Sequence, residues 1–239
     1  MTTSLDIEPV SDIEIRERRF FFRFSIALTV TVLIGFGSFI AIGISSFDSP
    51  WWVHLHAVSF MSWITLYVVQ SLLVLRNTVK PHRQLGMIGA ALAVWMVLVG
   101  LTLTPVTIAA DRMPPFFTPT VFLALDWVNV ILFGILVAAA LYLRRQTDWH
   151  RRLMLCATIC VVAPALGRLL ALADAATPSN NVALLLIYVA VAMIADRRIR
   201  GRVHPAYFWG GGTILAMAPA VALLGALPAF QQFAMSFQG

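Results

Sequence analysis

Long apolar runs alternate with short polar connections along most of the chain. A helix of about 20 apolar residues crosses the ~30 Å hydrocarbon core of a bilayer. We therefore predict an all-α integral membrane helix bundle, with a cytoplasmic polar tail over residues 1–23 and a single transmembrane domain over residues 24–239. Seven spans are expected, at about 24–45, 53–75, 86–108, 117–143, 153–173, 182–195 and 206–228. The sixth is the shortest, so whether it crosses the membrane completely is left open.

The basic residues are distributed asymmetrically about these spans. All but two of the 17 Lys and Arg residues fall in the N-terminal tail or in the connections after spans two, four and six. The two exceptions are Arg112 and Arg168. Because cytoplasmic loops carry such an excess of positive charge, the N-terminus is expected in the cytoplasm and the C-terminus outside. The acidic start is unlike a signal peptide, so the first span is expected to remain uncleaved.

Composition supports the membrane class. The chain is 60% hydrophobic and 12% charged, and its mean hydropathy is +0.85. The net charge of +6 reflects the basic loops expected on the cytoplasmic side. These loops favour contact with membrane lipids that carry anionic headgroups on that side. We expect no nucleic-acid partner. Two cysteines, Cys156 and Cys160, are too few for a disulfide framework and are expected to pack between helices.

Two of the basic connections can be aligned without a gap. They are LRNTVKPHRQLG (residues 75–86) and LRRQTDWHRRLM (residues 143–154), in which Leu, Arg, His, Arg and Leu recur at the same positions. The connection after span six keeps only the spacing from Arg198 to His204. This pattern favours three hairpins repeated about an axis along the membrane normal.

Each of these connections carries a histidine at the expected cytoplasmic end of a span: His82, His150 and His204. The positive end of a helix dipole favours neutral imidazole, which can ligate haem iron or another metal ion. We predict haem b, or another redox-active ligand, as the cofactor, bound by histidines from this set, with His82 and His150 as the metal ligands. The adjacent Arg83 and Arg151 would pair with haem propionates. The alternative is that these side chains hydrogen-bond lipid phosphates or exposed backbone.

A second polar group is expected in the outer leaflet. His56 lies in span two, Asp126 and Asn129 in span four, and Arg168 in span five. Ionisable residues inside a membrane face the bundle and pair with one another. We therefore predict an ion pair between Asp126 and Arg168, within a polar pocket completed by His56 and Asn129. The alternative is a buried pair that only fixes the helix register.

Short motifs carry a resemblance to a group of known proteins. The pattern H-x6-W-x6-Q from His56, then HRQLG at His82 and HRRLM at His150, resembles uncharacterised bacterial multi-pass inner-membrane proteins. These helix starts are also loosely similar to those of membrane b-type cytochromes and of proteins linked to respiratory oxidase assembly. The resemblance covers about residues 54–170. A departure is that the outer histidines lie on one span, so a two-haem arrangement is not expected.

The resemblance implies a multi-pass protein of the bacterial inner (plasma) membrane, with a haem or redox connection and a respiratory or other membrane-protein partner. It defines no reaction, so whether the protein is an enzyme is left open. The alternative function is a non-catalytic membrane assembly or scaffold protein, or a small-molecule binding protein that uses the outer pocket.

Overall fold

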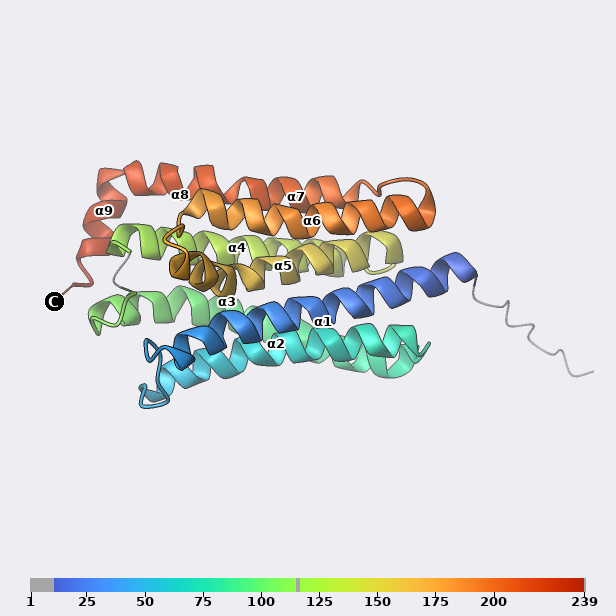
Figure 1. The fold of residues 1–239 in the computed structure, drawn as a ribbon, viewed down its shortest axis with the longest axis horizontal. Helices are drawn as coiled ribbons and strands as arrows, with labels where there is room; N and C mark the ends of the chain where they lie inside the picture. Colours follow the sequence, from blue (N-terminus) through green and yellow to red (C-terminus); the bar gives the residue numbers. More distant parts are fainter. Residues whose placement is uncertain (1–10, 115–116, 239) are drawn as a thin grey trace, which may run out of the picture.

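The computed structural model describes residues 11–114 and 117–238, and within these residues the only regular secondary structure is helical (Figure 1). The all-α prediction is therefore confirmed. The helices are α1 (Asp12–Ala41), α2 (Trp51–Leu75), α3 (Val79–Ala109), α4 (Pro119–Tyr142), α5 (Thr147–Leu172), α6 (Pro178–Arg200), α7 (Ala206–Leu215), α8 (Met217–Ala226) and α9 (Pro228–Met235).

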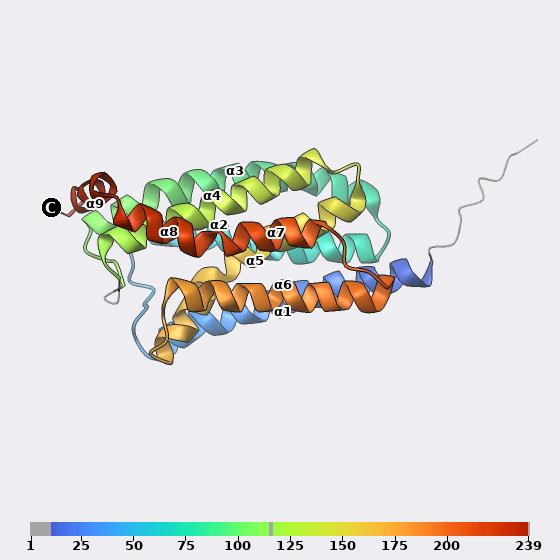
Figure 2. The same cartoon turned by 90° about the horizontal axis from the view of Figure 1, so that it is seen from above.

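Six helical segments of the described chain are long and apolar enough to cross a membrane. They are α1 to α5 and the segment Ala206–Ala226, in which α7 and α8 follow each other directly. The chain is therefore a multi-pass membrane protein. Helix α6, which contains the predicted sixth span, is 23 residues long but is not among the six. It nevertheless runs along the bundle in contact with α1, α5 and α7 (Figures 1 and 2).

The basic connections gather at one end of the bundle. The start of α1 and the α2–α3, α4–α5 and α6–α7 connections all lie at this end in Figure 1, and the C-terminal helix α9 lies at the other. This arrangement agrees with the distribution of Lys and Arg in the sequence. We call the basic end the inner end and the opposite one the outer end.

Helix α1 begins well before the first apolar run. The Ser11 side chain accepts a hydrogen bond from the Glu14 backbone N–H at 3.3 Å, and Asp12 and Glu14 place negative charge at the positive end of the helix dipole. The predicted tail boundary at residue 23 thus falls inside a continuous helix, whose first turns already bury Glu17. Residues 1–10 of the predicted tail lie outside the described residues.

Helix α5 forms the centre of the bundle. It contacts α1, α4, α6 and α7, and most of its side chains from Arg152 to Leu166 are buried. Small residues permit this packing, as is usual between membrane helices. A Cβ atom at Gly35 of α1 would lie 2.5 Å from the Ala165 carbonyl oxygen, and one at Gly210 of α7 would lie 2.7 Å from the Cys156 Cβ. Both cysteines of α5 are free and buried, so their predicted packing role is confirmed.

Candidate functional site

Six charged side chains from three helices form a continuous network of ion pairs at the inner end, which we call the inner ion cluster. Arg152 is 0% exposed, and its Nη2 donates to Glu17 Oε1 at 2.7 Å and to Asp196. Glu17 is 1% exposed and also pairs with Arg151 at 2.8 Å and Arg200 at 2.7 Å. Three carboxylates therefore face three guanidinium groups. The members are Glu17 of α1, Asp148, Arg151 and Arg152 of α5, and Asp196 and Arg200 of α6.

The cluster satisfies its charges internally. Buried ions are tolerated only when partners replace the lost hydration, and Arg152 meets this condition with two carboxylates, the Asp148 carbonyl oxygen at 3.0 Å and the face of the Tyr207 ring at 5.7 Å. The sequence pattern did not predict this cluster, because it placed Glu17 in the polar tail and because membrane topology alone accounted for Arg152. The available signal was an acid, Glu17, embedded among four arginines at helical spacing.

Two of the three predicted inner histidines come together near the cluster. His150 Nδ1 lies 2.8 Å from the Ala140 carbonyl oxygen, so it donates there and leaves Nε2 of the neutral ring as an acceptor. The His82 ring lies within electrostatic reach of His150, and its Nδ1 is buried without a hydrogen-bond partner among residues 11–114 and 117–238. Gln70 of α2 lies beside His82, and its Oε1 is likewise buried without a partner. We call Gln70, His82 and His150 the histidine site.

His204 is held differently. Its Nδ1 accepts a hydrogen bond from the Ala206 backbone N–H at 3.2 Å, so the neutral ring carries its proton on Nε2. Its ring lies edge-on to Trp149, with 5.2 Å between centroids, and its backbone N–H donates to Asp196 at 2.8 Å. Burial, reinforced by the positive charge of Arg152, holds the pKa of His204 below its ordinary value. His204 therefore offers no free nitrogen in its neutral form.

Within residues 11–114 and 117–238, no three His, Cys, Asp or Glu side chains are grouped so that they could hold a metal ion. The expected convergence of all three inner histidines is not found there. The arginines that directly follow His82 and His150 differ in the partners they have. Arg151 is committed to Glu17 and Asp148, whereas Arg83 is exposed and makes no ion pair with any described residue. Of these two arginines, Arg83 is therefore the one whose guanidinium group is available to a ligand at the histidine site.

The predicted ion pair in the outer half is wrong. Asp126 accepts a hydrogen bond from the Thr104 hydroxyl of α3. Arg168 instead donates to the Pro164 carbonyl oxygen at 2.9 Å and lies over the Phe36 ring of α1, 4.0 Å from its centroid. Among the described residues no salt bridge joins Asp126 to Arg168, because the two side chains leave their helices toward different neighbours.

The remaining outer residues still form a polar region. His56 interacts electrostatically with both Asp126 and Arg168, and its ring stacks on Phe60 with 4.3 Å between centroids. Asn129 is buried one turn from Asp126. Three buried atoms in this half have no hydrogen-bond partner in the described part of the chain: Asn129 Oδ1, Arg168 Nε and Asn181 Oδ1. Asn181, whose Nδ2 donates to the Ala163 carbonyl oxygen at 3.0 Å, was missed by the sequence analysis because it lies at the edge of a predicted span.

The face of α2 that carries H-x6-W-x6-Q points into the bundle over its whole length. His56 lies in the outer half, Gln70 belongs to the histidine site, and Trp63 between them is 2% exposed. The Trp63 indole N–H donates to the Thr158 hydroxyl of α5 at 3.3 Å, and its ring packs edge-on against Phe133. The H-x6-W-x6-Q spacing therefore marks one face of α2, which contributes His56 to the outer polar region and Gln70 to the histidine site.

Comparison with known proteins gives no relative. No family model, no curated protein and no solved structure matches this chain. Its function is therefore inferred from the chemistry of its own residues.

Proposed function

We propose that this multi-pass membrane protein binds haem b, or another redox-active metal ligand, through His82 and His150 at the inner end. The observation that carries the proposal is the buried, unpartnered Nδ1 of His82 beside a second imidazole. Buried polar atoms without partners are rare and call for an explanation. A metal ion bound by the ring would supply one.

The hydrogen bond of His150 supports the same proposal. Metal-ligating histidines usually donate their other ring N–H to a carboxylate or a carbonyl oxygen, which fixes the tautomer and the ring orientation. His150 donates to the Ala140 carbonyl oxygen in this manner. Exposed Arg83 would pair with an anionic substituent of the ligand, such as a haem propionate. A bacterial inner-membrane location and a respiratory partner belong to the same proposal.

A visible spectrum tests this function. The protein is expressed with haem supplied, purified in detergent, and measured as a reduced-minus-oxidised difference, while metal content is measured on the same sample. We expect Soret and α bands that are lost or strongly weakened in His82→Ala and in His150→Ala. The matched control is His54→Ala, since His54 is exposed at the outer end and contacts the Phe47 carbonyl oxygen at 3.1 Å. Absence of both bands and bound transition metal would overturn the proposal.

The buried Asn129 Oδ1, which has no hydrogen-bond partner among the described residues and lies one turn from Asp126, favours a second function. We propose that the region around His56, Asp126 and Asn129 binds a small polar molecule in a non-catalytic membrane protein. A thermal-shift screen with small carboxylates, amines and phosphates tests this, because a ligand that binds only the folded state raises its stability. The shift should vanish in Asn129→Leu. A panel that shifts nothing, or shifts the variant equally, contradicts it.

A further inference from the structure

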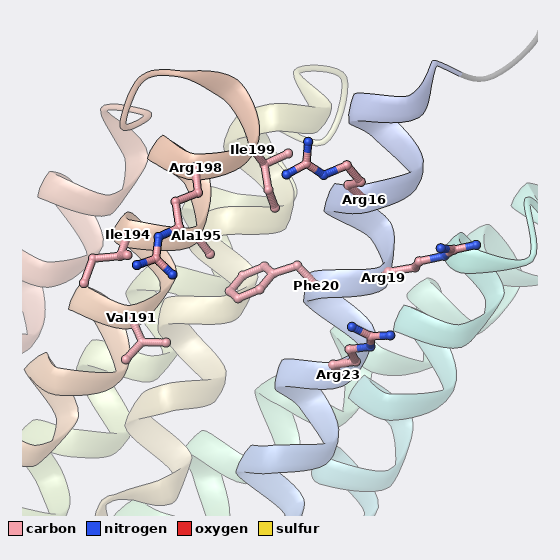
Figure 3. A pocket seen from close by; sticks show the side chains of 9 residues that line it. All are labelled: Arg16, Arg19, Phe20, Arg23, Val191, Ile194, Ala195, Arg198 and Ile199. Atoms are coloured by element: carbon pink, nitrogen blue, oxygen red, sulfur yellow. The ribbon is translucent and has the colours of Figure 1, made fainter.

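An open groove of about 650 Å³ lies between α1 and α6 at the inner end (Figure 3). Its lining combines four arginines with five apolar side chains. The arginines come from the first turns of α1 and the last turns of α6, and the apolar residues lie between them. The lining residues are Arg16, Arg19, Phe20, Arg23, Val191, Ile194, Ala195, Arg198 and Ile199.

Helical spacing produces this groove. Arg16, Phe20 and Arg23 recur every three or four residues and so share one face of α1, and Val191, Ile194 and Arg198 share one face of α6 in the same way. In Figure 3 the Phe20 ring extends from α1 toward α6, Arg16 approaches Ile199, and the Arg198 guanidinium group lies beside Ile194. The groove therefore has an apolar floor with Arg16 and Arg198 beside it, whereas the Arg19 side chain extends from α1 away from α6 in Figure 3.

The four arginines of the groove have no protein partner. None of Arg16, Arg19, Arg23 and Arg198 makes a salt bridge or a side-chain hydrogen bond with a described residue, and all four are exposed. Two neighbouring acids of α1, Glu14 and Glu17, are already engaged. Glu17 points into the inner ion cluster, and Glu14 pairs with Arg18 at 2.7 Å. The lining of the groove thus includes four exposed arginines, next to an ion cluster in which three carboxylates face three guanidinium groups.

We propose that this groove binds one anionic phospholipid of the inner leaflet. The phosphate would accept bidentate hydrogen bonds from the guanidinium groups, which match its geometry. An acyl chain would lie along Phe20, Val191 and Ile194, the last two of which are 45% and 52% exposed. A soluble anion would use the arginines but not this apolar strip, which is why a lipid fits better. The site is separate from the histidine site and does not depend on it.

Lipid binding is tested on the full chain in detergent after delipidation. Phosphatidylglycerol, phosphatidylcholine with the same acyl chains, and inorganic phosphate are added separately, and bound lipid is counted by native mass spectrometry alongside the melting temperature. We expect one phosphatidylglycerol to be retained and to raise the melting temperature. Phosphatidylcholine should do neither. Equal binding of the two lipids, or an equal shift from inorganic phosphate, would overturn the proposal.

Charge variants locate the site. At about 1 kcal/mol per arginine, the double variant Arg16→Gln/Arg198→Gln should weaken phosphatidylglycerol binding about 30-fold. The matched control is Arg197→Gln/Arg202→Gln, which removes the same charge from exposed positions at the same end but outside the groove. Elution as a single species by size exclusion confirms that both variants fold. Equal weakening in both variants means that only the net charge matters, which also overturns the site.

Discussion

Replacing Arg152 by Met tests the role of the inner ion cluster in stability. Arg152 is fully buried and neutralises Glu17 and Asp196, so its removal leaves three carboxylates facing two guanidinium groups. Removing one partner from a buried ion pair costs about 3–5 kcal/mol, because the remaining charge is uncompensated. For a chain of this size, that cost lowers the melting temperature by about 6–20 °C.

The measurement is fluorescence-detected thermal unfolding in one detergent, with two companion variants. Arg144→Met removes an exposed arginine whose only side-chain hydrogen bond to a described residue goes to the Leu141 carbonyl oxygen, so it should change stability by less than about 0.5 kcal/mol. The double variant Arg152→Met/Asp196→Asn restores charge balance and keeps an oxygen that can accept from the His204 N–H. It should therefore be more stable than Arg152→Met alone.

Two results would refute this account of the cluster. One is a melting temperature of Arg152→Met within about 2 °C of the wild type, which would mean a loss of no more than about 1 kcal/mol. The other is strict additivity of Arg152→Met and Asp196→Asn, which would show that the two groups do not interact.

Two further predictions concern the helices that pack on α5 and the loop beside the cluster. Gly210→Ala should destabilise the protein by about 1–3 kcal/mol, because its new Cβ meets Cys156, whereas Gly212→Ala, with open space at its Cβ position, should be neutral or stabilising; equal melting temperatures for the two variants would contradict this. Lowering the pH should destabilise the wild type through His204, since its pKa is lower in the folded state than in the unfolded chain. The stability contributed by neutral His204 is complete above the pKa of histidine in the unfolded chain, about 6.5, and is lost as the pH falls through the lower pKa of His204 in the folded state. His204→Asn should flatten the melting-temperature profile between pH 7 and 5, and an unchanged slope would rule His204 out as its source.

Much of the fold follows from apolar runs alone. The spans predicted at 53–75 and 117–143 coincide closely with α2 and α4, because a helix of this length is the simplest way to satisfy the backbone in lipid. The first helix was predicted to begin too late, because the tail was extended to residue 23 whereas α1 begins at Asp12. Its first turns are polar and were assigned to a tail, although Ser11 followed by Glu14 is a recognised helix-start signal.

The site was harder to predict, since a sequence gives the depth of a side chain but not its direction around the helix axis. Asp126 and Arg168 were placed at a similar depth, yet one turns toward Thr104 and the other toward Phe36. His82 and His150 do lie within electrostatic reach of each other, because the α2–α3 and α4–α5 hairpins return their helix starts to one end, and their role as ligands stays a prediction. The repeated motif placed both histidines at the start of a helix at the same end of the bundle, which isolated residues such as Asp126 and Arg168 could not do.

The composition of the inner ion cluster has a consequence for biosynthesis. Its charges come from α1, from the start of α5 and from the end of α6, so Arg152 finds Asp196 only after synthesis has passed α6. Until then a growing chain holds an arginine that cannot be buried with its full set of partners. Helix α6, which is not among the six candidate spans, therefore supplies the last two charged members of the cluster, and α7 then adds the Tyr207 ring against Arg152.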